Sequence, residues 1–209
     1  MDGDRLGLSH LRGALRRADL RQHRTLEQFD FRNHPELRKL VYRIYLDPAF
    51  VREGRSLILI GPAGLGKTHL AEAIAVHIAQ TGFDVRWARV QWLMSRVQRC
   101  DGTRDRKRFL TPYRRCDLLV LDDLGCHVPG TGSEFYELIA DRCEKRATII
   151  TSNLSLTEWD RPFEDSALAS MIVERLVRCG DISCLTTHPC RRTSKGTERD
   201  EGGQSATTD

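Results

Sequence analysis

The chain has 209 residues, of which 40% are hydrophobic and 30% charged, and a formal net charge of +4 at pH 7. This length and composition suit one soluble domain with a buried core and leave little room for a second domain. No apolar run approaches the roughly 18 residues of a membrane span, and the first residues lack the hydrophobic stretch of a signal peptide, so we expect a cytoplasmic protein without a membrane partner.

The N-terminal part of the chain divides into two segments. Residues 1–25 are rich in arginine and predict a separate basic segment, in the form of a helix. Residues 26–50 lead into the main domain, which we expect to span residues 26–190. Within this lead-in, Pro35 opens a helix predicted over residues 36–46, with apolar residues on one face.

The next segment carries the most specific motif in the sequence. Residues 61–68 read GPAGLGKT and match the P-loop pattern G-x-x-x-x-G-K-[ST] at every fixed position. An apolar strand predicted over 56–60 precedes the motif, and a helix predicted over 67–80 follows it. The loop glycines let backbone amides point at phosphate, Lys67 adds positive charge beside the β and γ phosphates, and Thr68 offers a hydroxyl ligand to Mg²⁺. The sequence therefore predicts a triphosphate site.

A basic tract begins at the next predicted strand, 85–88. Residues 86–115 contain ten Arg or Lys and two Asp, a local balance of +8, which leaves the remaining chain at −4. Such a tract is suited to duplex DNA, because phosphate contacts give salt-dependent affinity with little sequence preference. A solvated, arginine-rich helix face is the alternative. We assign the aromatic residues of the tract, Trp87, Trp92 and Phe109, to the core.

A second acidic motif follows the strand predicted over 118–121. Asp122 and Asp123 end this strand, at the sheet edge where a P-loop nucleotide binds. Asp122 is the expected partner of Mg²⁺, and Asp123 is placed to orient or deprotonate the attacking water. Together with the loop, this pattern indicates a Walker B motif.

Two further strands complete the predicted sheet, at 147–151 and 182–185. Asn153 follows the first of them and is placed to hold the attacking water. The alternation of strands and helices predicts an α/β P-loop fold of three layers, with a mostly parallel sheet covered by helices on both faces. The polar tail, 191–209, is expected to be disordered.

Seven cysteines, an odd number without a C-x-x-C pair, fit reduced thiols better than a disulfide framework. A zinc site at Cys184, His188 and Cys190 is an alternative, but this spacing matches no common zinc finger and supplies no fourth ligand.

Several motifs in one order resemble a known family. GPAGLGKTHLA, LLVLDDLG, ATIITSNLSLTEW, Asp165 and residues 174–176 are similar to the core of IstB-like transposition helpers, AAA+ relatives of the DnaC helicase loader. The resemblance covers residues 26–185. It implies an oligomeric, DNA-binding ATPase that uses Mg²⁺ and ATP, captures target DNA and stimulates a partner transposase. It also implies that Arg175 is an arginine finger for the ATP of a neighbouring subunit, with an exposed helical arginine beside Arg178 as the alternative.

The sequence departs from the family at both ends. The family's additional N-terminal DNA-binding region has no counterpart of similar length before Gly61, which suggests a truncated chain. Residues 187–192 read THPCRR and lack the family's Gly-x-Ser-x-Arg signature. A degenerate copy that binds ATP without productive hydrolysis is therefore one alternative function. A DnaC-like helicase loader and a small P-loop kinase are the others.

The predicted site combines the residues of these motifs. Those expected to bind nucleotide are Gly61, Pro62, Ala63, Gly64, Leu65, Gly66, Lys67, Thr68, His69 and Asp122. Thr68 and Asp122 are the expected Mg²⁺ residues, and Asp123, Asn153 and Arg175 the expected catalytic ones. The expected partners are duplex DNA, a transposase and further copies of the chain.

Overall fold

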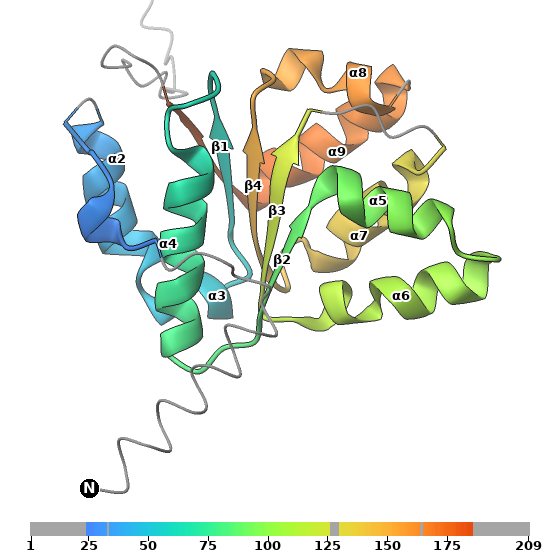
Figure 1. Cartoon of the computed structure of the whole chain (residues 1–209), viewed down its shortest axis with the longest axis horizontal. Coiled ribbons are helices and arrows are strands. Elements are labelled where there is room, and N and C mark those ends of the chain that lie inside the picture. The colour runs from blue at the N-terminus through green and yellow to red at the C-terminus, as the bar shows by residue number, and fades with distance from the viewer. Residues whose placement is uncertain (1–23, 33, 126–129, 164, 186–209) are drawn as a thin grey trace, which may run out of the picture.

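A five-stranded parallel sheet organises this computed structural model, which describes residues 24–32, 34–125, 130–163 and 165–185 (Figure 1). The strand order is β2-β3-β4-β1-β5, and every neighbouring pair is parallel. The strands are β1 (Ser56–Ile60), β2 (Val85–Arg89), β3 (Leu118–Leu124), β4 (Ala147–Ser152) and β5 (Gly180–Cys184). All five predicted strands are present. The largest difference is in β3, which continues to Leu124 and so contains both acids of the predicted Walker B motif.

Helices cover both faces of the sheet, which confirms the predicted three layers (Figure 1). One face carries η1 (Leu26–Gln28), α2 (Pro35–Leu40), the π-helical turn η2 (Val41–Tyr45), α3 (Pro48–Arg52) and α4 (Lys67–Gln80). The other carries α5 (Val90–Gln98), α6 (Thr103–Arg115), α7 (Gly132–Arg142), η3 (Leu156–Glu158), α8 (Asp160–Phe163) and α9 (Ser166–Cys179).

The alternation of side chains along the strands divides the core into two parts. Leu57 and Leu59 of β1 belong to the part beneath α4, whereas Ile58 and Ile60 belong to the part beneath α5, α7 and α9. Each strand of a sheet covered on both faces must be apolar at nearly every position, as β1 is.

Helix α4 has the predicted bounds, and the apolar residues on its sheet-facing side, Leu70, Ala71, Ile74, Ala75 and Ile78, are all buried. The helix predicted over residues 36–46 is different from expectation. It starts at Pro35 as α2, but from Val41 to Tyr45 it widens into a π-helical turn, in which the Leu46 amide donates to the Val41 carbonyl. Val41 and Tyr45 are both fully buried by this turn.

A buried arginine joins three elements on the α7 side of the sheet. Arg142, at the end of α7, donates to the carbonyl oxygens of Tyr113 at 2.8 Å and Cys116 at 2.9 Å, and also to that of Ala147. Its Nε donates to Thr148 Oγ1 at 3.1 Å. The guanidinium thereby satisfies carbonyl groups at the end of α6 and the start of β4.

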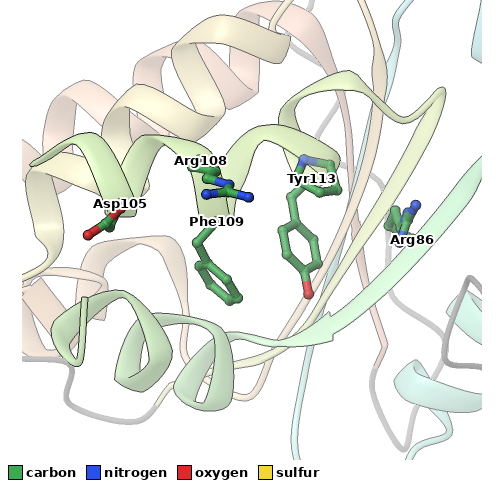
Figure 2. A pocket seen from close by; sticks show the side chains of 6 residues that line it. Arg86, Asp105, Arg108, Phe109 and Tyr113 are labelled. Carbon is green, nitrogen blue, oxygen red and sulfur yellow. The ribbon is translucent and has the colours of Figure 1, made fainter. Parts of the chain in front are cut away.

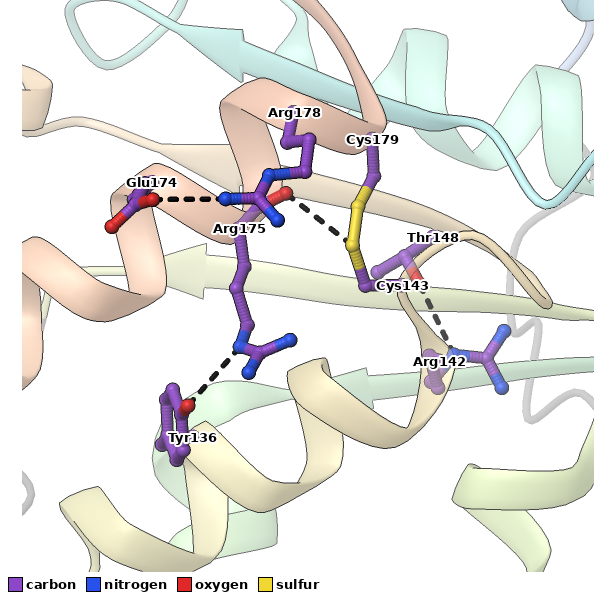
Figure 3. Close-up of a disulfide and its surroundings, with 8 residues drawn as sticks. All are labelled: Tyr136, Arg142, Cys143, Thr148, Glu174, Arg175, Arg178 and Cys179. Carbon is purple, nitrogen blue, oxygen red and sulfur yellow. Dashed lines mark hydrogen bonds and ion pairs between the residues drawn. A yellow bond between two sulfur atoms is a disulfide. The ribbon is translucent and has the colours of Figure 1, made fainter.

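The cysteine prediction is wrong for one pair. A disulfide joins Cys143, which follows α7, to Cys179, the last residue of α9 (Figure 3). The two helices lie side by side and bring these positions together across 36 residues of sequence, and no spacing rule in the sequence signals that contact. Cys100, Cys116 and Cys184 lie outside the disulfide.

Several predictions lie outside the described residues. They are the basic segment 1–25 apart from Arg24 and Thr25, the tail 191–209, and His188 and Cys190 of the alternative zinc site. Within the described part of the chain, no helix combines the length and the apolar character that crossing a bilayer requires.

Candidate nucleotide-binding site

The P-loop connects the buried end of β1 to the first turn of α4, as the sequence predicts. Gly66 caps α4 with φ 82°, a left-handed conformation that favours glycine. A Cβ at this position would lie 2.8 Å from Cε2 of Phe29, so the ring of Phe29 packs directly against the loop. The first amides of α4 have no intrahelical acceptor, and this helix end is therefore suited to an anion.

The Lys67 ammonium folds back over its own loop. Its Nζ donates to the carbonyl oxygens of Gly61 at 2.6 Å and Pro62 at 2.8 Å. Burial lowers the pKa of Lys67 from its usual value, and the charges of Asp123 and Asp122 act in the opposite direction. The ammonium thus lies against its own loop, in the electrostatic field of both acids.

Thr68 and Asp122 connect the loop helix to β3. The Thr68 hydroxyl donates to Asp122 Oδ1 at 2.8 Å, and Asp122 is only 3% exposed. A second hydroxyl, that of Thr151 at the end of β4, donates to the same carboxylate oxygen at 2.7 Å. Asp122 is therefore a buried carboxylate held by two hydroxyl groups from two different elements.

Asp123 adopts an unusual conformation beside this carboxylate. Its φ is 62°, and the pairing of β3 with β4 is irregular between Leu121 and Leu124. The Asp123 amide donates to Thr151 Oγ1 at 2.9 Å. Because of this bulge, the side chains of two consecutive residues have different surroundings: Asp122 is buried in the site and Asp123 is exposed.

Asn153 follows β4 and is exposed. Its side-chain oxygen lies so close to Gly125, just beyond β3, that a Cβ on Gly125 would overlap it. The ends of β1, β3 and β4 thus bring Lys67, Thr68, both acids and Asn153 to one edge of the sheet, where a parallel α/β sheet binds its ligands.

His69 and Arg175 have other surroundings. His69 Nε2 lies 2.9 Å from the Thr25 carbonyl oxygen, and its ring meets Phe29 edge-on. These contacts hold the lead-in segment against α4. Arg175 lies on α9, where it contacts Tyr136 of α7 (Figure 3), and the structure does not bring it to Lys67 of its own chain.

The basic tract forms β2, α5 and α6 and has two kinds of charged residue. Arg106 pairs with Glu134, and Arg114 pairs with Glu137 and Asp141, so these two arginines attach α6 to α7. The exposed members are Arg89, Arg96, Arg99, Arg104, Lys107, Arg108 and Arg115.

An open groove of about 430 Å³ lies beside β2 and α6, and Figure 2 shows Phe109 and Tyr113 projecting from α6 toward it. Arg86 and Arg108 also line it, whereas no residue of the P-loop does. The prediction that Trp92 belongs to the core is wrong, because its side chain is 51% exposed on α5, while Trp87 and Phe109 are partly buried against the core.

Sequence reasoning missed Thr151 and Gly125. Thr151 ends a predicted strand, but its contact with both acids depends on the bulge in β3. No residue pattern in the sequence predicts that bulge. Gly125 lies two residues after Asp123, and the position of the Asn153 side chain explains the need for glycine there.

The donor set suits Mg²⁺, because Thr68 and Asp122 offer hard oxygen atoms already 2.8 Å apart beside the helix end that is suited to an anion. Lys67 and the loop amides suit the phosphates of a nucleotide. This parallel sheet, its loop and its acids define a P-loop nucleotide-binding protein of the AAA+ class.

Comparisons with known proteins extend this assignment. The family model of IstB-like ATP binding proteins matches residues 8–196, and the chain belongs to that family. An insertion sequence IS21 protein of Pseudomonas aeruginosa, whose name describes ATP binding, is 34% identical over 80% of this chain. A corresponding IS232 protein of Bacillus thuringiensis is 29% identical over 73%. The chain spans 65% and 62% of the lengths of these two relatives.

Solved structures agree on the fold. DnaI matches with a TM-score of 0.68 and 22% identity, over 82% of this chain and 92% of its own. The DnaC helicase loader matches with a TM-score of 0.63 and 24% identity, over 78% of this chain and 97% of its own. The expected fold class is therefore confirmed.

Proposed function

We propose that this chain is the ATPase of an insertion-sequence transposition system, which binds and hydrolyses ATP with Mg²⁺ in order to hold target DNA for a partner transposase. The observation that carries the proposal is the meeting of Lys67, Thr68, Asp122, Asp123 and Asn153 at one edge of the sheet, in a chain of this family.

Each residue has a part that follows from its position. Lys67 exchanges its two loop carbonyls for the β and γ phosphates, which the amides at the start of α4 also bind. Thr68 and Asp122 would hold Mg²⁺, and the bound ion would supply positive charge against the negative charge that develops on the phosphates. Asp123, exposed beside them, orients the attacking water and accepts its proton. Asn153 holds the same water from the neighbouring strand.

The last positive charge of the proposed site comes from Arg175 of a neighbouring subunit. Arg175 lies on α9, apart from its own chain's Lys67, which fits the proposed role on the nucleotide of an adjacent copy. A guanidinium contributed by a neighbour makes hydrolysis depend on oligomer formation. This arrangement would link the ATPase cycle to assembly on DNA.

The DNA surface is formed by the exposed basic residues of β2, α5 and α6. Their charges face solvent, whereas Arg106 and Arg114 are engaged by acids of α7. Contacts of this kind bind the phosphate backbone of duplex DNA with little sequence preference.

The test measures nucleotide and DNA binding with three proteins. Wild type should retain ATP with Mg²⁺, release phosphate, and bind duplex DNA more tightly with ATP than without nucleotide. Lys67→Ala should lose ATP retention and the ATP-dependent part of DNA binding. A variant with Arg104, Lys107 and Arg108 changed to Gln should keep ATP retention and show a shallower dependence of DNA affinity on salt. DNA affinity that is indifferent to nucleotide would count against the proposal.

A helicase loader is the second candidate, since DnaI and the DnaC helicase loader share this fold. The family match favours the transposition role. Co-purification of the chain with the transposase of its insertion sequence, compared with a replicative helicase, separates the two. Retention of the helicase alone would select the loader.

A further inference from the structure

We propose that Thr151 is a positioning residue of the nucleotide site, whose single hydroxyl sets the geometry of both acids of β3 and thereby tunes Mg²⁺ binding. The inference rests on the proposed Mg²⁺-nucleotide function of the same site and adds to it a residue to which the sequence motifs assign no role.

The contacts of Thr151 assign its hydroxyl proton. Oγ1 lies 2.7 Å from Asp122 Oδ1 and 2.9 Å from the Asp123 amide nitrogen. An amide only donates and a carboxylate only accepts, so the hydroxyl proton points to Asp122 and an oxygen lone pair receives the Asp123 amide. One atom of β4 therefore bridges the two consecutive acids of β3.

The surroundings give this bridge its importance. Thr151 is 1% exposed and Asp122 is 3% exposed, so water cannot substitute for a missing partner. Both hydroxyls, those of Thr151 and Thr68, bind the same oxygen, Oδ1, of Asp122. This arrangement fixes the plane of the carboxylate on the side where Thr68 would meet the metal.

The second contact acts on Asp123. Its left-handed backbone, with φ 62°, is costly for a residue other than glycine and needs support from its neighbours. The bond from its amide to Thr151 provides such support. It keeps the bulge that turns Asp122 inward and leaves Asp123 exposed, so both acids depend on one hydroxyl.

The decisive substitution is Thr151→Val, which keeps the shape and removes the hydroxyl, with Thr151→Ser as the variant that restores it. Thr148→Val is a matched control. Thr148 is also a buried threonine of β4, but its hydroxyl accepts from Arg142 and lies apart from the acids. The readout is the Mg²⁺ concentration that gives half-maximal retention of a fluorescent ADP. It is measured by titrating Mg²⁺ into the protein with the bound nucleotide analogue, and it requires no hydrolysis.

Thr151→Val should raise that Mg²⁺ concentration about tenfold, in keeping with the loss of one hydrogen bond to a charged group. Nucleotide retention in EDTA should remain as in wild type. Thr151→Ser should lie within about twofold of wild type, and Thr148→Val should lower the melting temperature without changing the Mg²⁺ requirement. An unchanged Mg²⁺ requirement in Thr151→Val, or an equal change in Thr148→Val, would overturn the proposal.

This design separates the inference from the proposed function. If wild type binds Mg²⁺-nucleotide but releases no phosphate, and Thr151→Val raises the Mg²⁺ requirement, the positioning role of Thr151 is supported and ATP hydrolysis is not. If wild type hydrolyses ATP and Thr151→Val titrates as wild type does, the ATPase proposal stands and the positioning role falls. A wild-type chain that retains no nucleotide at any Mg²⁺ concentration overturns both.

Discussion

The guanidinium of Arg175 lies over the ring of Tyr136, with 5.3 Å between its central carbon and the ring centroid, and its Nε donates to the phenol oxygen at 3.1 Å (Figure 3). The pair connects α9 to α7 within one chain. In the proposed oligomer, an arginine held in this way would be ordered before a neighbouring copy arrives, so less side-chain entropy would be lost on assembly.

Mixed oligomers test whether Arg175 acts between chains. Arg175→Ala should retain ATP but lose phosphate release by a factor of about 10³ or more, because its neighbour's nucleotide loses the guanidinium. Lys67→Ala should be inactive as well. When the two inactive proteins are mixed, a Lys67→Ala chain supplies its intact Arg175 to the ATP of an Arg175→Ala chain, and phosphate release should return in part.

The matched control for this experiment is Arg178→Ala. Arg178 is an exposed arginine of the same helix whose guanidinium pairs with Glu174 at 3.0 Å. Its loss should leave hydrolysis near the wild-type rate. Mixtures that stay inactive at every ratio would contradict an intermolecular role for Arg175.

Gly125→Ala should uncouple hydrolysis from binding. The added methyl group would occupy the space of the Asn153 side-chain oxygen and displace that side chain. We expect ATP retention within about twofold of wild type and a loss of phosphate release of about 10- to 100-fold, comparable with that of Asn153→Ala. Single-turnover hydrolysis should show that the double variant is no slower than Asn153→Ala, since both changes remove one function. Additive losses would exclude the shared mechanism.

Arg142→Met should destabilise the fold by about 2–4 kcal/mol, because the buried carbonyl groups of α6 and β4 lose their donor. The measurement is denaturant unfolding, with Arg146→Met as the control. Arg146 pairs with Asp117 on the partly exposed surface, where an ion pair contributes little. Equal stability of the two variants would show that the buried guanidinium is dispensable.

Alkylation should distinguish the Cys143–Cys179 pair, Cys116 and Cys184 from one another. Without reductant, the Cys143–Cys179 peptide pair should be recovered unlabelled. Burial raises the pKa of the Cys116 thiol, so its reactive thiolate is scarce at pH 8 and it should react far more slowly than exposed Cys184. Raising the pH toward 10 should increase the Cys116 rate, and unfolding should remove the difference. Labelling of Cys143 or Cys179 in unreduced protein would contradict the disulfide.

Much of the site could be predicted because its parts are local in sequence. The P-loop, the strand before it and the helix after it occupy residues 56–80, and their pattern alone predicts β1 and α4 with their observed bounds. The carboxyl ends of parallel strands share one edge, which is why Lys67, Asp122 and Asn153 meet there as expected.

The parts that the sequence did not predict depend on contacts between distant residues. Thr151 meets the acids only because β3 bulges after Leu121, and Cys143 meets Cys179 only because α7 and α9 lie side by side. The exposed position of Trp92 has the same origin. Its place on α5 fits a core residue by type, yet the packing of α5 on β3 turns it outward.

The junction between α9 and β5 connects the helix that carries Arg175 to the sheet. Helix α9 ends at Cys179 and β5 begins at Gly180, so no linker separates them, and a Cβ on Gly180 would overlap the Ser56 backbone of β1. The strand that leads into the P-loop, β1, therefore packs directly against the residue that follows α9, the helix that carries Arg175. If Arg175 serves a neighbouring subunit, as we propose, its displacement would be transmitted through α9 directly to β1, the strand that leads into the P-loop.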